Sequence, residues 1–554
     1  MISNNYCLKI LSAAVIAGFS ASCSSSAAAK SSPTGMLSKA DDQPPKPFVV
    51  PAKPDALQAK SNANPCNYSS DMGAGNPLAI AKLANARGYN VLFITSDEHN
   101  AQMTGYERTL GFETEIRTPY LDKLAAEGAY FTNAYVACPL CAPTRQTIYT
   151  GLYPVEHGLI NHNTIFQDQP TWGDFFTSQG YYTGVIGKTH DNRPVRNNFG
   201  FQYVAKNSGV GVSNELKSPA NLQRPFTPAE DRPFYEKAAE LKSNEGQLRG
   251  GVLQDVLQDQ DGMVVKLTKE FLEKNRDRKF FLHASLIAPH WPWNSPKEFY
   301  HMYDPAKLKM PVNMGPPVDL QPSNIYNREE WNKITPEMHR VFRARYMGAL
   351  SWMDDNVGQI IKKLDELGLK DKTLVIYSSD HGDMAGEKGM WFKMIMYEPS
   401  ARVPLIIRMP GVIEPGTVNN TLINHVDYYP TVAGLTGNAE YIPDFLTGND
   451  LTAAVLGIGS GPEYTFAVRS TPEKGAVPFA QMARSNQYKL VRYAGGEDRE
   501  YTFFDIGNDR HENNNLINNP AYKTVIDIHK KALENFMTSL RYSDFPVVKI
   551  GGGQ

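Results

Sequence analysis

The sequence predicts an α/β protein: a three-layer α/β/α sandwich around a large, mostly parallel mixed sheet, with a smaller C-terminal α+β domain containing a short antiparallel sheet. Two observations predict the larger part. From about residue 76, short apolar runs alternate with helical stretches, and four of the runs suit strands buried on both faces. A third observation predicts the smaller part, because after about residue 456 the chain changes to short strand-like pieces followed by a helix. We therefore expect domains over 76–456 and 457–554.

Length and charge agree with this organisation. The 554 residues exceed what one compact core usually organises. Apolar residues at 41% and charged residues at 21% are typical of a soluble globular protein. A formal net charge of −2 gives no reason to expect nucleic acid or an anionic membrane surface as a partner.

The N-terminal segment 1–23 has the pattern of an export signal, and 24–75 that of a flexible tether rich in Ser, Ala, Pro and Lys. Lys9 precedes an apolar stretch over 10–19 that is too short to cross a bilayer as a helix. Small residues before Cys23 resemble a bacterial lipoprotein cleavage box, although Ser20 stands where a Leu-like residue is usual. Lipid anchoring and simple secretion both stay open. We expect an exported bacterial protein that is periplasmic, anchored to the outer membrane as a lipoprotein, or secreted.

The four apolar runs that predict buried strands are 90–96, 182–187, 280–287 and 373–379. The clearest helix carries an apolar stripe from Leu350 to Leu367 and stops at Gly368. In the C-terminal part, strands are expected over 464–468 and 488–493, and a helix over 521–541.

Each predicted buried strand is followed by polar or charged residues. They are Asp97 and Glu98, then Lys188, Thr189 and His190, then His290, and finally Asp380 and His381. Any one of them alone is more simply a helix cap or a turn residue. Because ligands bind outside the carboxyl ends of parallel strands, the whole set predicts a site at one edge of the sheet.

The acidic members of this set predict a metal site. Asp97, Glu98 and Asp380 offer oxygen ligands of the kind that Ca²⁺ or Mg²⁺ prefers, and His381 adds a nitrogen ligand or a hydrogen-bond donor. Carboxylates gathered so closely would repel one another without a cation.

The segment 138–151 predicts a helix that presents an anion site. Pro143 suits the first turn, and Gly151 suits the position after the last turn. Cys141 then lies at the helix N-terminus, where backbone N–H groups favour an anion, and Arg145 follows one turn later.

Cys141-Ala142-Pro143-Thr144-Arg145, followed by Thr150-Gly151, resembles the signature of the type I sulfatases of the alkaline phosphatase superfamily. Further pieces match that family in order. They are Asp97-Glu98, Gly187-Lys188-Thr189-His190, Ala288-Pro289-His290, Ser379 to Asp383, Lys393 within 391–394, and the C-terminal phrases 503–505 and 515–516. The resemblance covers roughly residues 88–435 and its tail, and it implies hydrolysis of a sulfate ester.

The resemblance also implies a modification and a set of roles. A formylglycine-generating enzyme converts Cys141 to formylglycine, whose hydrate attacks sulfur, with one hydroxyl on a divalent metal, Ca²⁺ in preference to Mg²⁺, and Asp380 taking the proton. Arg145, Lys188 and Lys393 stabilise the sulfuryl oxygens, and His290 and Lys393 are the candidates to protonate the leaving alcohol. His190 removes the second proton of the hydrate, which releases sulfate.

Three positions depart from the commonest family pattern. Glu98 replaces the usual second Asp, so its longer arm can leave it beside the metal rather than on it. His381 stands where Asn is frequent, which resembles choline sulfatases and phosphonate monoester hydrolases of the same superfamily. Thr144 replaces a frequent Ser.

Other interpretations of these residues remain. Cys138 and Cys141 form a Cys-x-x-Cys pair as in disulfide oxidoreductases, and Cys138 either stays a buried thiol or pairs with Cys66. Tyr135, Trp291 and Trp293 either line a substrate pocket or pack in the core, and His162 can fall near the site.

The sequence therefore predicts a sulfatase acting on a sulfated carbohydrate or a similar small ester. The alternatives are a phosphonate or phosphate monoester hydrolase or a choline-sulfatase-like enzyme on the same fold, and a catalytically silent binder of sulfated glycans.

Overall fold

The computed structural model of the chain describes residues 86, 88–162, 169–193, 198–219, 224–240, 248–311, 313–314, 331–469, 479–494 and 499–541. The predicted export signal (1–23), the tether (24–75) and Cys66 lie outside these residues. Among the helices of the described part, none is long and apolar enough to cross a membrane.

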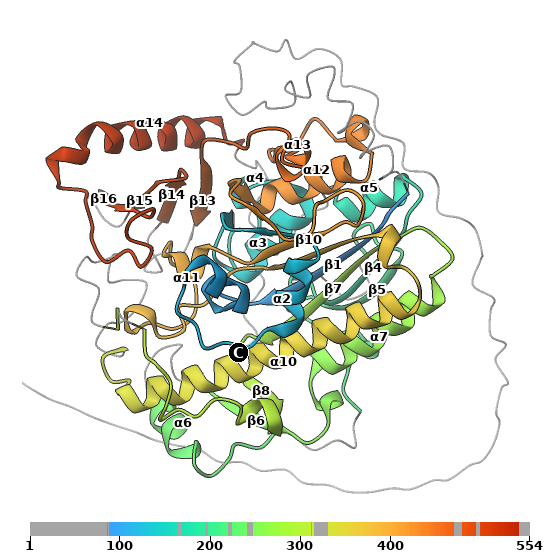
Figure 1. Cartoon of the computed structure of the whole chain (residues 1–554), viewed down its shortest axis with the longest axis horizontal. Coiled ribbons are helices and arrows are strands. Elements are labelled where there is room, and N and C mark those ends of the chain that lie inside the picture. The colour runs from blue at the N-terminus through green and yellow to red at the C-terminus, as the bar shows by residue number, and fades with distance from the viewer. Residues whose placement is uncertain are drawn as a thin grey trace, which may run out of the picture. The chain divides into compact units, whose positions relative to one another are not determined.

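The centre of the molecule is an eight-stranded sheet in the order β11-β2-β10-β9-β1-β7-β4-β5. Figure 1 labels β10, β1, β7, β4 and β5 of this sheet. Its strands are β1 (Asn90–Asp97), β2 (Ala129–Phe131), β4 (Tyr182–Lys188), β5 (Tyr203–Asn207), β7 (Phe280–Pro289), β9 (Thr373–Ser379), β10 (Leu405–Arg408) and β11 (Thr417–Asn419). The neighbours β9, β1, β7, β4 and β5 are all parallel, whereas β10 is antiparallel to both β9 and β2. This mixed, mostly parallel sheet confirms the predicted fold class and the four predicted buried strands.

Helices cover both faces of the sheet (Figure 1). One face packs against α2 (Pro119–Ala126), α7 (Gln260–Lys274) and α10 (Pro336–Glu366). On the other face lie α3 (Cys141–Thr150), α4 (Pro154–His157), α5 (Trp172–Ser178), α12 (His425–Leu435) and α13 (Thr452–Val455). Shorter helices are α6 (Arg232–Ala239), α8 (Lys297–Tyr300) and α11 (Glu398–Ala401).

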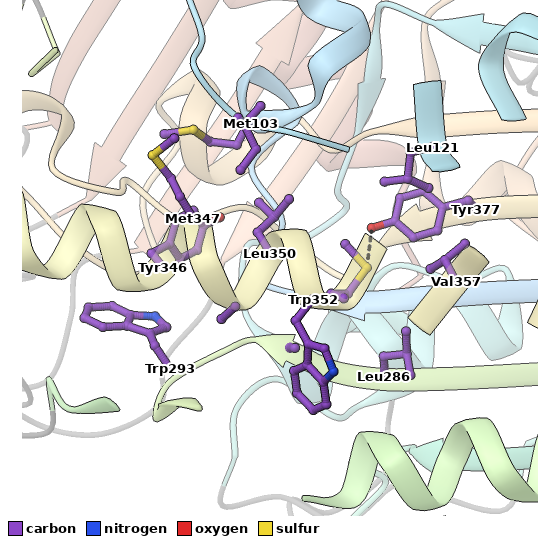
Figure 2. Close-up of a cluster of buried hydrophobic side chains, with 14 of the residues drawn as sticks. Met103, Leu121, Leu286, Trp293, Tyr346, Met347, Leu350, Trp352, Val357 and Tyr377 are labelled. Carbon is purple, nitrogen blue, oxygen red and sulfur yellow. Dashed lines mark hydrogen bonds between the residues drawn. The ribbon is translucent and has the colours of Figure 1, made fainter. Parts of the chain in front are cut away.

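The long helix α10 shows how the sequence pattern becomes packing. Thr335 caps its start by accepting a hydrogen bond from the Met338 amide, and Pro336 occupies the first turn. The predicted stripe is buried at Leu350, Met353, Val357, Ile360 and Leu364, and Gly368 follows the helix with a φ of 66°. Figure 2 shows Leu350 and Val357 of this stripe in one buried cluster with Leu121, Leu286 and Tyr377, so α10 fixes the face of the sheet beneath the strand ends.

The C-terminal part is a four-stranded antiparallel sheet covered by one helix. Its strands are β13 (Thr465–Arg469), β14 (Phe479–Arg484), β15 (Tyr488–Ala494) and β16 (Arg499–Asp505), and α14 (Lys523–Ser539) packs on β14 and β15. The two remaining pairs are β12 (Ile423–Asn424) with β3 (Ala134–Tyr135), and β6 (Gly250–Leu253) with β8 (Trp293–Pro296). The short antiparallel sheet and the terminal helix are as predicted, whereas the boundary at 456/457 stays a prediction.

Candidate active site

The carboxyl ends of β1, β7 and β9 bring the predicted residues together at one edge of the sheet. Ser96 of β1 is in register with Ser379 of β9, so Asp97 and Asp380 follow side by side. The register between β1 and β7 shifts after Thr95, which aligns Asp97 with Pro289 and brings His290 to the same edge. On β4, Gly187 has a φ of 106°, and a Cβ there would overlap the Ser285 carbonyl oxygen. Only glycine therefore lets Lys188 approach β7.

Cys141 is the first residue of α3, in the helical layer that α3 forms with α4, α5, α12 and α13, and its side chain points to the strand ends. The helix is buried along its whole length and ends at Gly151 with a φ of 65°. The Cys141 Sγ lies 2.9 Å from His381 Nε2 and 3.8 Å from Asp97 Oδ1. The helix N-terminus, with its free N–H groups, therefore faces the acidic strand ends, as the sequence predicted.

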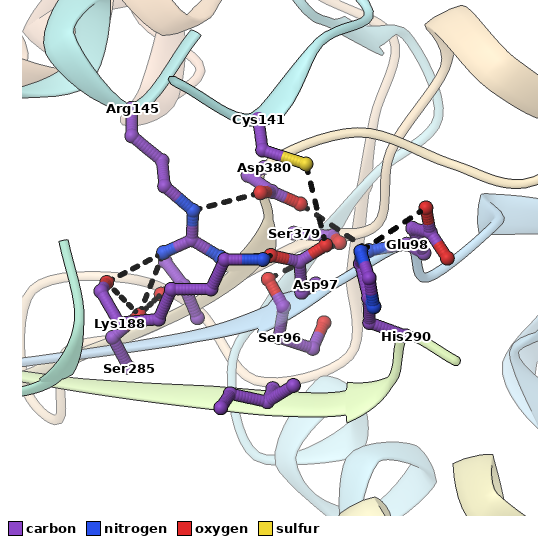
Figure 3. Close-up of polar contacts among 12 residues, drawn as sticks. Ser96, Asp97, Glu98, Cys141, Arg145, Lys188, Ser285, His290, Ser379 and Asp380 are labelled. Atoms are coloured by element: carbon purple, nitrogen blue, oxygen red, sulfur yellow. Dashed lines mark hydrogen bonds and ion pairs between the residues drawn. The ribbon is translucent and has the colours of Figure 1, made fainter. Parts of the chain in front are cut away.

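Arg145, one turn after Cys141, joins the two aspartates (Figure 3). Its Nη2 and Nε each lie 2.8 Å from a carboxylate, of Asp97 and Asp380 respectively. Its Nη1 donates to the Lys188 carbonyl and to Ser285 Oγ, both at 2.7 Å. With its side chain 2% exposed, this guanidinium is a buried cation held by four hydrogen bonds.

Lys188 adds a second cation on Asp97, with Nζ 2.6 Å from Oδ2. Burial alone would raise the pKa of Asp97, but Lys188, His290 and Arg145 together hold it well below its usual range. For Asp380, burial outweighs Arg145 and raises the pKa to about 6. Asp97 is thus a permanent anion, whereas Asp380 can exchange a proton near neutral pH.

His381 completes a group suited to a cation. Ligand atoms of Asp97, Cys141, Asp380 and His381 all lie within 4.8 Å of one another, and all four residues are buried. His381 Nδ1 is 2.9 Å from the Gly382 carbonyl oxygen, which can only accept, so Nδ1 carries the proton and Nε2 faces the group as a lone-pair donor. Two carboxylates and an imidazole nitrogen fit a divalent metal.

Glu98 is turned away from that group and forms a second one with His290 and Lys393. Lys393 makes an ion pair with Glu98 Oε1, and its Nζ lies 3.3 Å from His290 Nε2. Burial lowers the pKa of Lys393 to about 8 and that of His290 to about 3, so Lys393 carries the proton of the pair at neutral pH. Glu98 also shares a possible metal group with Asp97 and His290. Its place as a ligand stays a prediction.

His190 lies on the other side of Cys141. It offers a nitrogen within 4.8 Å of ligand atoms of Cys141 and His162, and its ring stacks on that of His162 at 4.8 Å. Burial lowers the pKa of His190 well below its usual value, so the ring is neutral and can accept a proton. Cys141 is shared by the His190 group and the Asp97–Asp380–His381 group, and Asp97 is shared by that group and the His290 group, so His190 and His290 are linked through the residues between them.

The two thiols of the Cys-x-x-Cys pair are both free and buried. Burial raises the pKa of Cys138 to about 12 and that of Cys141 well above its usual value. Neither is a thiolate near neutral pH, so the unmodified thiols lack the reactive form that disulfide exchange requires.

The aromatic candidates divide between core and site. Trp293 is fully buried against Trp391 and Phe342, and Tyr135 is bonded to Glu398 beneath the C-terminal sheet. Trp291 is half-buried and packs on the His290 ring at 5.1 Å. Only Trp291 of the three therefore lies at the site.

A cavity of about 470 Å³ opens beside His290. Its lining includes Asp259, Asn294 and Trp352, from the start of α7, from β8 and from α10. Sequence reasoning missed this lining, and it also missed Ser285, because the polar residues stand inside or next to apolar runs that suggest packing alone. His290, which follows β7, joins the cavity to the predicted site, because its side chain lines the cavity and also contacts Lys393.

Comparison with known proteins agrees with this geometry. Residues 89–438 match the family model described as sulfatase, and residues 386–539 match the model of the N-sulphoglucosamine sulphohydrolase C-terminal region. Among curated relatives, an ulvan-active sulfatase of Formosa agariphila is 27% identical, over 79% of this chain and 78% of its own length. A choline-sulfatase of Rhizobium meliloti is 28% identical, over 78% of this chain and 83% of its own.

Solved structures share the fold. An enzyme solved in complex with its substrate D-glucosamine-2-N,6-O-disulfate has a TM-score of 0.64 at 19% identity, covering 82% of this chain and 99% of its own. A phosphonate monoester hydrolase from Silicibacter pomeroyi has a TM-score of 0.68 at 21% identity, covering 82% of this chain and 96% of its own. At these identities the likeness concerns the fold alone.

Proposed function

The chain belongs to the sulfatase family and is a sulfuric ester hydrolase, and from that premise we propose that it works through a formylglycine at position 141 with a bound Ca²⁺. The observation that carries the proposal is the group around Cys141. A helix N-terminus, two buried cations and two carboxylates surround one side chain that is 1% exposed. A tetrahedral sulfate monoester, which carries one negative charge, would meet fixed positive charge in such a site without reorganisation.

The ligand set for the metal is Asp97, Asp380 and His381 with the side chain at 141, and Glu98 beside it. Hard oxygen ligands favour Ca²⁺, or Mg²⁺ in its place. The cation would supply positive charge beside the reacting group, and formylglycine, as its hydrate, would supply the attacking hydroxyl. A bound Ca²⁺ would also relieve the repulsion between Asp97 and Asp380, which Arg145 bridges.

The chain's own residues have complementary tasks. Asp380, a buried carboxylate in the same group as the side chain at 141, is placed to accept the proton of the attacking hydroxyl. Arg145 and Lys188 bind the sulfuryl oxygens, because both present N–H groups next to Asp97. His190, a neutral ring within 4.8 Å of Cys141, accepts the proton whose removal releases sulfate.

Lys393 and His290 act at the leaving alcohol. Attack in line leaves the departing oxygen on the side of sulfur away from residue 141. Lys393 and His290 contact each other beside Glu98. Asp97 lies next to both Glu98 and Cys141, so this pair is close to the reacting side chain. Protonation by Lys393, with His290 in hydrogen-bond reach of its Nζ, stabilises an alkoxide that is a poor leaving group.

We propose a sulfated carbohydrate as the substrate. The cavity beside His290 is lined by the amide of Asn294 and the carboxylate of Asp259, polar groups of the kind that bind the hydroxyl groups of a sugar. The relative that acts on ulvan and the neighbour bound to a disulfated glucosamine support this class. The export signal predicted over 1–23 would agree with a substrate outside the cytoplasm, and maturation would then require a formylglycine-generating enzyme.

The test compares turnover of 4-nitrophenyl sulfate, 4-nitrophenyl phosphate and a phenylphosphonate ester, followed by a panel of sugars sulfated at single positions. We expect the sulfate ester to have the highest kcat/KM. Higher kcat/KM on the phosphonate would instead favour a phosphonate monoester hydrolase, the alternative raised by His381. Absence of all turnover in protein with a modified residue 141, together with binding of sulfated glycans, would make the chain a silent binder.

A further inference from the structure

The backbone on either side of Lys393 adopts an unfavourable conformation. Phe392 has a φ of 70° and Met394 a φ of 80°, both in the left-handed region that side-chain-bearing residues rarely occupy. Such residues persist only where their surroundings hold them. The segment that presents Lys393 to Glu98 and His290 therefore needs support from outside itself.

The C-terminal sheet supplies that support through Arg469, the last residue of β13. Arg469 Nη1 donates to the Met394 carbonyl oxygen at 2.8 Å, and Nη2 lies 3.2 Å from Met394 Sδ. The Met394 amide in turn donates to the Pro139 carbonyl oxygen at 2.9 Å, in the turn that leads to Cys141. Both backbone groups of the strained Met394 are thus bonded to distant parts of the chain.

A second set of contacts fixes the continuation of the same segment. Lys489 of β15 donates to the Met396 carbonyl oxygen at 2.9 Å and pairs with Glu398 at 2.8 Å and with Glu512 at 2.6 Å. Glu512 accepts the Glu398 amide at 2.7 Å. These contacts anchor residues 396–398. Only residues 394 and 395 lie between this anchor and Lys393, and Arg469 holds the first of them, Met394.

We propose that Arg469 is a positioning residue that holds the strained turn at Met394 and thereby aims Lys393 at the leaving oxygen. The inference rests on the proposed role of Lys393 and adds a task for the C-terminal sheet. Arginine suits this task, because one planar guanidinium reaches the carbonyl and the sulfur of Met394 from a site that is 1% exposed. Without it, the turn can relax, and Lys393 withdraws from the reacting group.

If Arg469 positions Lys393, the loss of kcat in an Arg469 variant should depend on the leaving group of the substrate. If Arg469 only packs, it should not. Protonation matters for an alkyl sulfate, such as a sugar sulfate, and much less for 4-nitrophenyl sulfate, whose phenolate leaves without help. Loss of packing alone would lower activity on both substrates alike, through the fraction of folded enzyme. The ratio of the two kcat values therefore reports on Lys393.

The experiment measures both kcat values for Arg469→Gln, Lys393→Met and the double variant, in enzyme carrying the modified residue 141. We expect Arg469→Gln to lower kcat on a sugar sulfate about tenfold or more and on 4-nitrophenyl sulfate by less than about threefold. In the Lys393→Met background, Arg469→Gln should add less than about twofold, since the two residues act on one step. Arg469→Lys, which retains one donor, should restore part of the loss.

Arg408→Gln is the matched control, because Arg408, like Arg469, is 1% exposed. Arg408 pairs with Glu127 at the end of β10 that lies away from Lys393. It should lower the melting temperature without changing the kcat ratio. Equal loss on both substrates for Arg469→Gln, while Lys393→Met alone changes the ratio, overturns the positioning role of Arg469. If Lys393→Met also leaves the ratio unchanged, the proposed role of Lys393 is wrong, and the inference fails with it.

Discussion

Replacement of Arg145 by Gln tests the electrostatic design of the site. The guanidinium bridges two buried carboxylates at 2.8 Å each and makes two further hydrogen bonds at 2.7 Å. Gln keeps a polar group of smaller reach but removes the charge. Removal of one partner from a buried ion pair costs about 3–5 kcal/mol, because the remaining charge stays uncompensated.

The expected shift in melting temperature follows from the size of the protein. Unfolding entropy is about 2.1 cal/mol/K per residue, so the roughly 450 residues from 86 to 541 give about 1 kcal/mol/K. A loss of about 3–5 kcal/mol then lowers the melting temperature by about 3–5 °C. The measurement is calorimetry in a chelator, and the shift should shrink when Ca²⁺ is added, because the cation takes over the neutralisation of Asp97 and Asp380.

Arg108→Gln is the control for this experiment. Arg108 pairs with Asp122 at 3.4 Å, but its side chain is 46% exposed, so its loss should cost no more than about 1 kcal/mol. Equal shifts for the two variants, or an Arg145→Gln enzyme that melts with the wild type in chelator, would refute the reasoning that Arg145 neutralises the buried aspartates.

Three further predictions concern the thiol pair, the metal and pH. Cys138→Ala should leave kcat within about threefold of wild type, since a buried thiol with a pKa near 12 has no redox role; loss of activity would revive the oxidoreductase interpretation. Incubation with EDTA should abolish sulfate ester turnover, and Ca²⁺ should restore it better than Mg²⁺, as measured by initial rates. Burial lowers the pKa of His339 to about 4, and its ring accepts the Trp391 indole N–H at 3.0 Å. The unfolded chain then binds more protons below pH 6.5, so the stabilisation from neutral His339 is present above that pH and is lost toward pH 4. His339→Gln should flatten the fall in melting temperature over that interval; an unchanged slope would contradict the shift.

Buried parallel strands are the part of the fold that the sequence predicts best. The runs at 90–96 and 373–379 have apolar centres and are buried at every position, because helices cover both faces of β1 and β9. Those strands are parallel and in register, so the residues at their carboxyl ends, Asp97 and Asp380, lie side by side. This proximity could be predicted from the sequence alone. The short strands β2 and β11 carry three residues each, too few for a pattern, and they were not predicted.

Side-chain orientation could not be predicted in the same way. Glu98 follows Asp97 directly, yet its φ of 68° and its ion pair with Lys393 turn it toward His290. Ser285 lies inside an apolar strand, and only the fold brings it to Arg145. Arg469 contacts Met394 from 75 residues away, a distance over which local pattern carries no signal. Such contacts arise from tertiary packing and need coordinates.

Peptide mapping of residue 141 by mass spectrometry, on enzyme produced with and without a formylglycine-generating enzyme, tests the central claim most directly. The account predicts an aldehyde or its hydrate at 141 and sulfate ester turnover in proportion to the modified fraction. Full turnover by a preparation in which residue 141 is still a thiol, or by Cys141→Ala, would contradict it.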